Sequence, residues 1–516
     1  MSSFYVENFG CRATQSDGAA IEQQFRDCRL SRAEAPGQAD YVVLNTCAVT
    51  AAAEQDARAS IRRIRRQNPG CKIVVTGCYA QRAPEEVAAL PGVTRVVGNS
   101  HKHVLAKLAL IPDPLTHDAS TTDALTKDVL TNDLVQISGL APGQPRFIAL
   151  PELSEGANHP QRIFVSDIFA HTELLAAPVF DSANERTRPN LKIQDGCNNR
   201  CSFCIIPSLR GRSRSLPVED VLREVNQLVA AGYREVVLSG INLGRWGTDL
   251  PKTGVAAVET TKAWDGRPSK FADLVRTILE QTSIQKLRIS SVEPMDWTDS
   301  LIRLVAESSR IAKHAHVPMQ SGSDSVLRRM RRKYRPWHYR EKIEKIRAAM
   351  PTAAVGADVM VGFPGETDAE FEETYRMIED LSFTYLHVFT FSARPGTPAA
   401  SMANQVPVRV ARDRNQVLRE LAAEKKLNFM RSFAGKTIQA ITLGTQEFRL
   451  EANLPDAAIL TNALTDNYLK LRLRGNHAPN QWLQARITGT EDGELVGRPE
   501  PASRDAAQEL NMRPTA

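Results

Sequence analysis

Short apolar, β-branched segments alternate with longer amphipathic segments at the start of the chain. The segments that predict strands are residues 4–9, 41–44, 72–75 and 93–97, and those that predict helices are residues 19–26 and 51–66. Strands that alternate with helices indicate a small parallel sheet covered on both faces. We therefore expect an N-terminal parallel α/β domain over residues 1–110.

The alternation stops after residue 110 and resumes at Pro189. Residues 111–186 are rich in Pro, Asp, Thr and Ala and lack a sustained period, which predicts a linker or insertion. Beyond it, expected strands at 190–193, 235–238, 286–289, 314–317, 355–361 and 385–391 are mostly separated by expected helices at 218–230, 271–280, 300–308, 339–349 and 369–381. This series predicts a parallel (β/α) barrel, partial or complete, over residues 187–431, with its active site at the carboxyl ends of the strands. Residues 248–269 interrupt it and are expected to form a surface loop.

The pattern changes again near residue 432. Short strands are expected at 437–443, 458–461, 468–473 and 482–489, separated by Gly and Asn turns. A small all-β barrel over residues 432–498 is the simplest interpretation, followed by a frayed tail at 499–516.

Composition places the chain among globular proteins with several domains. Its 516 residues are 42% hydrophobic and 24% charged, which excludes a disordered or fibrous class. No apolar run approaches the ~20 residues that a membrane span needs, and the start MSSFYVENFG lacks the features of a signal peptide. We therefore expect a cytoplasmic protein without membrane contact, in which the eight cysteines act as ligands or catalytic thiols rather than as disulfides.

The net charge of +6 is small, but basic residues are clustered. The clusters are Arg62 to Arg66, the three arginines at 210, 212 and 214, and the run from 328 to 335. A solvated helix face explains any one of them, whereas three together favour a polyanionic partner. The run over 328–340 also contains Tyr334, Trp337, His338 and Tyr339, so it suits unpaired RNA. The alternative is a charged barrel helix with its aromatic side chains in the core.

The motif with the clearest chemistry is Cys197-x-x-x-Cys201-x-x-Cys204, directly after an expected strand. Gly196 permits the tight turn that presents the thiolates. Three soft ligands at this spacing select a soft metal or an iron–sulfur cluster. A structural zinc site would need a fourth Cys or His at short range, and none lies nearby. A cubane cluster held by three thiolates keeps one iron open to an external ligand.

Three further cysteines each follow an expected strand of the N-terminal domain. Cys11 follows the first strand, Cys47 the second and Cys78 the third. Because the carboxyl ends of parallel strands share one edge of a sheet, these thiolates are expected to meet there and hold a second cluster. Ordinary buried cysteines are the alternative. Cys28 and Cys71 lack this placement and are expected not to be ligands.

The cysteine spacing resembles the radical S-adenosylmethionine superfamily, and the whole chain resembles the methylthiotransferase family within it. The stretches that match are FGCRATQSDG, NTCAVT, TGCYAQ, DGCNNRCSFCIIPSLRGRSRS, VVLSGINLG, ISSVEP, VPMQSGSDSVLRRMRRKY and GADVMVGFPGETDAEFEET. Thr14 stands where the family usually has Asn, Ser16-Asp17-Gly18 replaces the common Tyr-Glu-Thr, and the linker is longer than usual. The resemblance covers the N-terminal domain, the barrel and a C-terminal TRAM-like domain.

The resemblance implies two [4Fe–4S] clusters and two uses of S-adenosylmethionine. Cys197, Cys201 and Cys204 would hold the radical-generating cluster, and Cys11, Cys47 and Cys78 an auxiliary cluster that carries the sulfur. Other matching positions would surround S-adenosylmethionine: Phe203, Ser239, Gly240, Asn242, Ser290, Ser291, Glu293 and Gln320. For the Gly, Ser and Asn positions, ordinary turn formation is the alternative. An electron donor such as flavodoxin or ferredoxin is also implied; the sulfur donor stays open.

Substrate choice divides the family. Its members act on a tRNA adenosine beside the anticodon, carrying an isopentenyl or a threonylcarbamoyl group, or on an aspartate of a ribosomal protein. The segments GCRATQ, NPGCKIVVTGCYAQ, SGSDSVLRRMRRKY and FTFSARPGTPAASM resemble the threonylcarbamoyl type. The expected reaction is thus methylthiolation at C2 of N6-threonylcarbamoyladenosine in the tRNA anticodon stem-loop, and a non-catalytic metal-containing RNA-binding module is the remote alternative.

Overall fold

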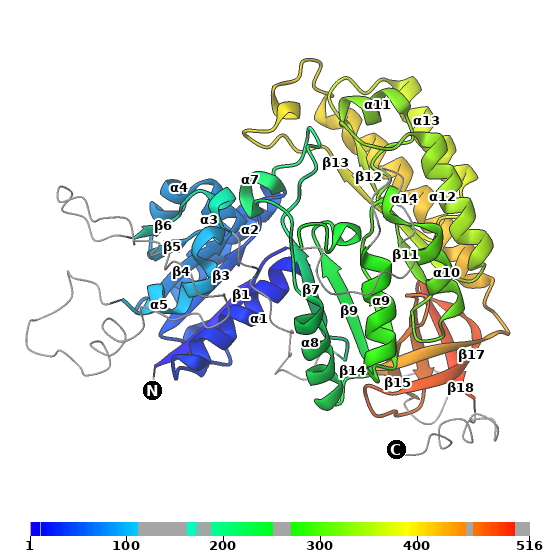
Figure 1. The fold of residues 1–516 in the computed structure, drawn as a ribbon, viewed down its shortest axis with the longest axis horizontal. Helices are drawn as coiled ribbons and strands as arrows, with labels where there is room; N and C mark the ends of the chain where they lie inside the picture. The colour runs from blue at the N-terminus through cyan, green and yellow to red at the C-terminus, as the bar shows by residue number, and fades with distance from the viewer. Residues whose placement is uncertain are drawn as a thin grey trace, which may run out of the picture.

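The computed structural model describes residues 2–10, 12–111, 162–171, 174, 187–250, 270–449 and 458–500. Cys11, most of the expected linker and of the 248–269 loop, and the tail from residue 501 lie outside the described residues. Figure 1 shows three regions: an N-terminal α/β part, a larger barrel-like part, and a small β-barrel packed under the latter.

The N-terminal part is a parallel sheet with helices on both faces, as expected. Its strand order is β2-β1-β3-β4-β5-β6. The strands are β1 (Ser3–Asn8), β2 (Ser31–Arg32), β3 (Tyr41–Thr46), β4 (Lys72–Gly77), β5 (Val93–Val97) and β6 (Ile163–Phe164), and the helices are α1 (Arg12–Asp27), η1 (Pro36–Gln38), α2 (Ala51–Gln67), α3 (Cys78–Arg82), α4 (Pro84–Ala88), η2 (Asn99–Val104) and α5 (Leu105–Leu110).

Alternation along β3 shows why both faces of this sheet are covered. Val42 and Leu44 belong to the apolar cluster that contains Ile61 and Ile64 of α2, whereas Val43 belongs to the cluster that contains Phe25 of α1. Successive side chains of a strand point to opposite faces, so a continuous apolar run requires a layer of helices on each side.

The prediction of a linker over 111–186 is wrong for one short segment. Residues 163–164 form β6, which pairs in parallel with Val96 and Val97 of β5 at the edge of the sheet. Two apolar residues are too short a run to show a strand period, so the sequence carries no signal for this strand.

The central part is a partial barrel of six parallel strands. Strands β10-β9-β7-β8 form one sheet and β11-β12-β13 another, and isolated bridges from Leu287 to Ile311 and from Ser291 to His316 join β10 to β11. Among the described residues, no pairing joins β7 to β13, so the barrel is open on that side. The strands are β7 (Asn190–Asp195), β8 (Arg214–Ser215, antiparallel to β7), β9 (Glu235–Gly240), β10 (Lys286–Ile289), β11 (His314–His316), β12 (Ala354–Val361) and β13 (Tyr385–Thr390).

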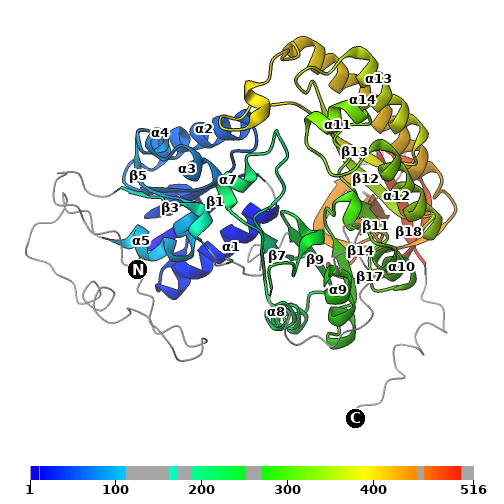
Figure 2. The same cartoon turned by 45° about the horizontal axis from the view of Figure 1, so that its top comes forward.

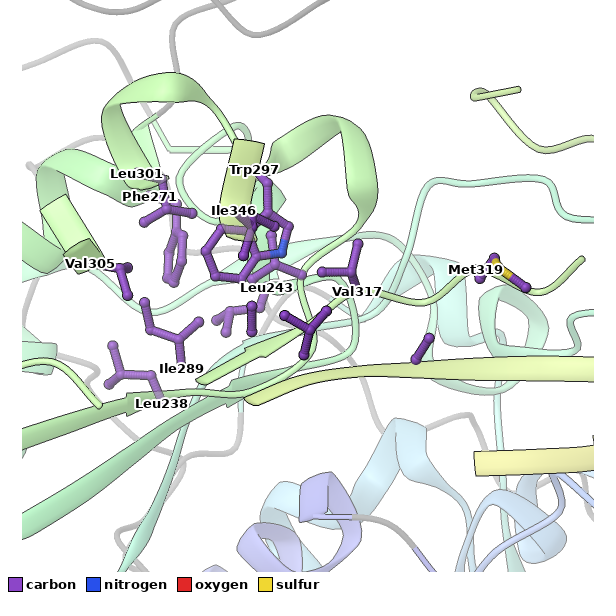
Figure 3. Packing of buried hydrophobic residues seen from close by; sticks show 14 of the residues in the cluster. Leu238, Leu243, Phe271, Ile289, Trp297, Leu301, Val305, Val317, Met319 and Ile346 are labelled. Carbon is purple, nitrogen blue, oxygen red and sulfur yellow. The ribbon is translucent and has the colours of Figure 1, made fainter. Parts of the chain in front are cut away.

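The helices of this part are η3 (Ile168–Ala170), α7 (Ile206–Arg210), α8 (Val218–Ala230), η4 (Leu243–Arg245), α9 (Lys270–Gln281), η5 (Pro294–Asp296), α10 (Asp299–Glu307), α11 (Asp324–Arg329), α12 (Pro336–Ala349), α13 (Asp368–Asp380), η6 (Pro398–Ser401) and α14 (Val408–Arg431). The long helices α8, α9, α10, α12, α13 and α14 cover the outside of the partial barrel (Figure 2), whereas α7 packs against α3 and η2 of the N-terminal part. Figure 3 shows Trp297 packed among Leu243, Ile346 and Val317, in the layer between strands and helices.

The C-terminal part is a closed five-stranded barrel, β14-β15-β16-β18-β17. Its strands are β14 (Thr437–Arg449), β15 (Ala458–Thr465), β16 (Lys470–Arg474), β17 (Trp482–Glu491) and β18 (Glu494–Pro499). The all-β expectation is confirmed, with one strand more than the sequence indicated. Strand β18 closes the barrel by pairing in parallel with β16 and antiparallel with β17.

The turn between β15 and β16, residues 465–469, docks this small barrel onto the partial barrel. Arg288 of β10 donates to the backbone oxygens of Asp466 and Thr465 at 3.2 and 3.5 Å, and its guanidinium lies 5.3 Å from the ring centre of Tyr468. Lys286 also lies 3.2 Å from Asp466. The 465–469 turn is therefore integral to the base of the partial barrel.

None of the described helices is long and apolar enough to cross a membrane.

Candidate functional site

The three cysteines of the Cys-x-x-x-Cys-x-x-Cys motif lie together on the loop between β7 and α7. Cys197, Cys201 and Cys204 all line a cavity of about 570 Å³ at the carboxyl ends of the barrel strands. This is the edge at which parallel barrels carry their active sites. The sequence-based placement of these thiols at a strand end therefore agrees with their position in the fold.

Backbone geometry fixes this loop. Gly196 has φ of +70°, and a Cβ there would lie 2.0 Å from the backbone oxygen of Arg212. The Cys197 amide donates to Gly211 O at 3.1 Å, and the Cys204 amide donates to Cys201 O at the same distance. A side chain at position 196 is excluded both by its left-handed conformation and by the close approach of the neighbouring chain.

Two of these thiols are protonated while no metal is bound. Burial raises the pKa of Cys197 to about 11 and that of Cys204 to about 12. Both are therefore protonated at neutral pH until a metal displaces the proton. Among the described residues, no three His, Cys, Asp or Glu side chains converge on one point as a single ion would require. A cubane instead binds each thiolate through a different iron, which needs a wider spacing.

Every residue expected to surround S-adenosylmethionine lines the same cavity. These residues come from the loop after β7 and from the ends of β9, β10 and β11: Phe203, Ser239, Gly240, Asn242, Ser290, Ser291, Glu293 and Gln320. Two of them carry buried oxygens with no hydrogen-bond partner among the described residues, namely Asn242 Oδ1 and Gln320 Oε1. Because a buried polar atom without a partner is costly, these oxygens mark where the donors of a ligand fit.

Gln320 is also held in an uncommon backbone conformation. Its φ is +65°, its amide donates to Asp358 O at 2.8 Å, and its own carbonyl accepts from the Met360 amide at 2.8 Å. A non-glycine residue in the left-handed region persists only where the surrounding structure fixes it, and such residues gather at binding sites. The fold thus presents the Gln320 side chain to the cavity.

Several cavity residues were missed by sequence reasoning. His314 and His316 of β11 and Tyr385 and His387 of β13 all line the inner wall. In each pair the two residues are separated by one position, which puts both side chains on the same face of a strand. The strings HAH and YLH could therefore have indicated polar side chains on the inner face of these strands. Arg332 was also missed: it donates to Cys201 Sγ at 3.2 Å and pairs with Glu293, but no local pattern shows that it is buried.

The N-terminal cysteines lie at the carboxyl edge of their own sheet. Cys47 and Cys78 are 5% and 2% exposed at the ends of β3 and β4, whose register pairs Thr46 with Gly77. Cys11 is outside the described residues, but its neighbour Gly10 is not. A Cβ on Gly10 would lie 2.9 Å from Cys47 Sγ, so this segment runs directly against Cys47.

The cavity of the Cys-x-x-x-Cys-x-x-Cys motif is also lined by residues next to the N-terminal cysteines. Ala13, two residues after Cys11, and Val49, two residues after Cys47, both line the cavity that Cys197, Cys201 and Cys204 line. The carboxyl edge of the N-terminal sheet therefore points into the mouth of the partial barrel. A molecule in the cavity can contact both edges at once.

Cys28 and Cys71, expected not to be ligands, lie away from the cavity wall. Cys28 is half-buried just beyond the end of α1, and Cys71 is buried just before β4. Burial raises the pKa of both thiols.

Some of the expected basic–aromatic surface is internal. Tyr334 and Tyr339 are 1% and 0% exposed and belong to the core, so stacking of RNA bases on them is excluded, whereas Trp337 is 57% exposed. Arg210 is buried, and only Arg212 of its cluster is exposed. In a sequence, aromatic residues of the core cannot be told from aromatic residues of an RNA-binding surface when both are interspersed with charged residues.

Two family models match the chain. The Radical SAM superfamily matches residues 191–378, and a family described as Uncharacterized protein family UPF0004 matches residues 3–98. The first match spans the partial barrel and its cysteine motif, and the second spans the N-terminal sheet with its three cysteines.

Relatives match over almost the whole length. The threonylcarbamoyladenosine tRNA methylthiotransferase MtaB of Bacillus subtilis is 34% identical, covering 92% of this chain and 91% of that protein. Its namesake from Rickettsia prowazekii is 31% identical over 95% of both chains. A tRNA-2-methylthio-N(6)-dimethylallyladenosine synthase from Novosphingobium aromaticivorans is 32% identical over 85% of this chain and 86% of that one. The chain belongs to the methylthiotransferase family of radical S-adenosylmethionine enzymes.

Proposed function

We propose that this enzyme transfers a methylthio group to C2 of N6-threonylcarbamoyladenosine, next to the anticodon of tRNA. The observation that carries the proposal is one cavity lined on one side by Cys197, Cys201 and Cys204 and on the other by Ala13 and Val49, which follow Cys11 and Cys47 by two residues in the sequence. A C–H bond of an aromatic ring is not opened by a general base, so the reaction needs a radical and a nearby sulfur carrier.

We assign Cys197, Cys201 and Cys204 to a radical-generating [4Fe–4S] cluster and Cys11, Cys47 and Cys78 to an auxiliary one. Enzymes of this family use S-adenosylmethionine and [4Fe–4S] clusters. When bound, these groups supply a carbon-centred radical and the sulfur to be transferred.

The protein's own side chains bind and orient the reactants. Asn242 Oδ1 and Gln320 Oε1 accept hydrogen bonds from amino or hydroxyl groups of the cofactor. Arg332 holds Cys201 and is itself fixed by Glu293. Phe203, Ser239, Gly240, Ser290 and Ser291 complete the wall on which the cofactor rests.

The cavity wall favours a polar substituent on the substrate base. His316, His387 and Asp358 line its inner part beside Tyr385, and His316 accepts or donates a hydrogen bond with Ser291 at 2.7 Å. A threonylcarbamoyl group brings a carboxylate and a hydroxyl, for which the imidazoles of His316 and His387 are hydrogen-bond partners, whereas an isopentenyl group is apolar. The relatives from B. subtilis and R. prowazekii are named for the threonylcarbamoyl nucleoside.

The partners follow from the same proposal. An electron donor such as flavodoxin or ferredoxin supplies the reducing electron, in the reducing environment of the cytoplasm. We divide the chain into an N-terminal domain to residue 110, a linker to 186, the radical domain to 431, a TRAM-like RNA-binding domain to 498 and a tail. Exposed Arg331, Lys333 and Trp337 provide cations and an aromatic ring for the anticodon loop.

Mass spectrometry of tRNA nucleosides tests the substrate. A strain without this gene should lose the methylthio-threonylcarbamoyl nucleoside and regain it on complementation. Loss of the methylthio-isopentenyl nucleoside instead would assign the other tRNA substrate, and unchanged tRNA with an unmodified ribosomal-protein aspartate would assign the protein substrate.

Cysteine variants test the chemistry. Replacing Cys197, Cys201 or Cys204 by Ala should abolish cleavage of S-adenosylmethionine, and replacing Cys47 or Cys78 should leave cleavage but no methylthio product. Cys28→Ala is the matched control and should behave as wild type. Two cubanes give about eight iron atoms per chain; zinc in their place would indicate a non-catalytic RNA-binding module.

A further inference from the structure

Five charged side chains are buried where the N-terminal sheet meets the first strand of the partial barrel. They are Asp17 of α1, Lys102 of η2, Lys192 and Asp195 of β7, and Arg210 of α7, and none is more than 5% exposed. We call them the buried ionic network. Nothing in the proposed chemistry uses these residues directly, and burying five charges is costly unless good pairing geometry and hydrogen bonds offset their desolvation.

Asp17 is the centre of this network. Its carboxylate contacts Lys102 Nζ at 3.0 Å and Arg210 Nη2 at 2.9 Å through Oδ2, and it pairs with Lys192 Nζ through Oδ1. Lys192 and Arg210 are 175 and 193 residues away along the chain. One carboxylate of the N-terminal domain therefore binds two cations of the barrel and one of its own domain.

Asp195 connects the network to the radical-site loop. It contacts Lys192 Nζ at 2.9 Å and Arg210 Nη1 at 3.0 Å through Oδ2, and its Oδ1 accepts from the Gly196 amide at 2.8 Å. Gly196 directly precedes Cys197. The turn that presents this cysteine is thus joined to Lys192 and Arg210, and through them its position relative to α1 depends on Asp17.

The same network reaches the cysteines of the N-terminal sheet. Lys102 donates to Asn45 Oδ1 at 3.3 Å, and Asn45, two residues before Cys47, donates to Thr14 O at 2.7 Å. From the neighbouring turn, Asn99 Nδ2 lies 3.7 Å from Cys78 Sγ and donates to Leu209 O of the barrel at 2.8 Å. Both cysteine-bearing edges are thus tied to one group of buried polar contacts.

An ionic contact of this kind fixes register better than an apolar one. Apolar surfaces slide past one another at little cost, whereas a buried carboxylate with three cationic partners has one arrangement that satisfies all of them. Register matters here because the sulfur-bearing site and the radical site must meet at one substrate atom. A misplacement of about 1 Å costs reactions of this kind about 100-fold in rate.

We propose that Asp17 is a positioning residue that locks the auxiliary-cluster edge in register with the radical-cluster loop. It acts through Lys192, Arg210 and Asp195, and it contacts neither cluster. The inference rests on the proposed two-cluster function for its readout but does not depend on which nucleoside is the substrate.

The test is Asp17→Asn in the full-length holoenzyme, which keeps the side-chain shape and removes the charge. The variant should load both clusters and cleave S-adenosylmethionine at the wild-type rate. Methylthio product per 5′-deoxyadenosine formed should fall about 100-fold. Pulsed dipolar EPR between the two reduced clusters should give a broadened distance distribution. Asp27→Asn, which removes an exposed carboxylate from the end of the same helix, should change neither readout.

A second variant separates register from stability. Asp17→Asn with Lys192→Met restores the charge balance without restoring the link, so it should fold better than the single variant but remain uncoupled. A wild-type ratio of methylthio product to 5′-deoxyadenosine in either variant, together with an unchanged inter-cluster distance, would overturn the proposal. Coupled product on a different nucleoside would refute the proposed substrate and leave this inference intact.

Discussion

The buried ion pair at the base of the partial barrel gives a quantitative prediction. Arg288 Nε lies 2.6 Å from Glu235 Oε1, and both side chains are fully buried. Changing Glu235 to Gln keeps the volume but removes the negative charge. The Arg288 guanidinium then stays buried beneath the 465–469 turn without its carboxylate, so the junction between the two barrels should become easier to open.

The magnitude follows from the geometry. At 2.6 Å, with an effective dielectric constant near 20, the attraction is about 6 kcal/mol before the cost of desolvation. Removing one partner of a buried pair generally costs 3–5 kcal/mol, roughly. Arg288 keeps its hydrogen bonds to the backbone oxygens of Thr465 and Asp466, which continue to stabilise its charge. We therefore expect a cost at the lower end, about 3 kcal/mol.

Hydrogen exchange measured by mass spectrometry is the suitable assay, because it reports local opening without requiring two-state unfolding of the whole chain. Peptides that contain β10 and the 465–469 turn should exchange about 100-fold faster in Glu235→Gln, as a cost of 3 kcal/mol implies. Peptides from the N-terminal sheet should exchange at the wild-type rate.

Two further variants frame the result. Asp380→Asn breaks an exposed pair with Arg340, 2.9 Å apart, and should cost at most about 1 kcal/mol. Replacing Glu235 by Leu together with Arg288 by Met should cost less than Glu235→Gln alone, because no unpaired charge remains buried. Wild-type exchange in Glu235→Gln would show that the pair contributes no net stability and that the argument is wrong.

Three other predictions concern the loops and the pH range. Gly10→Ala should prevent loading of the auxiliary cluster alone, and Gly196→Ala that of the radical cluster alone, since each Cβ would collide with its neighbouring chain at positive φ; iron analysis and EPR distinguish them. Burial, together with the charge of Arg214, lowers the pKa of His171 from 6.5 to about 4, so the unfolded chain binds more protons between these values. Stability should therefore fall by about 1–2 kcal/mol as the pH drops from 6.5 to 4, after allowance for solvent screening, and a His171→Asn variant should flatten this slope in urea unfolding. Thr367→Ala removes the capping box of α13 and should lower stability by about 1 kcal/mol, measured by the same unfolding experiment.

Patterns of short range allowed much of the fold to be predicted. Strand positions were visible because parallel strands buried on both faces are continuous apolar runs. Helix α14 was missed because its buried positions include Arg414 and small alanines, which leave a weak apolar stripe. Arg414 is buried because it pairs with Glu366 and Asp368, and such pairing over long range leaves no periodic trace in the sequence.

The candidate site also has parts that short-range sequence patterns predict and parts that depend on long-range contacts. The cysteine motif and the strand-end serines and glycine were predictable, because turns at the ends of parallel strands determine which residues meet. Their convergence with Tyr468 was not predictable, since this residue comes from a separate domain. Nor does the sequence distinguish an exposed Arg212 from a buried Arg210, because one of the two carboxylates that accept hydrogen bonds from Arg210, that of Asp17, is 193 residues away along the chain.

The 465–469 turn has a consequence for how such an enzyme can be shortened or recombined. Tyr468 lines the reaction cavity, has φ of +69° and lies 4.8 Å from the ring of His314. A chain that ended at Arg431 would lack Tyr468. Its cavity would lose part of its wall and open to water on the side where the C-terminal barrel docks. A C-terminal barrel exchanged from another protein would therefore have to supply a comparable side chain at this position to restore the cavity wall.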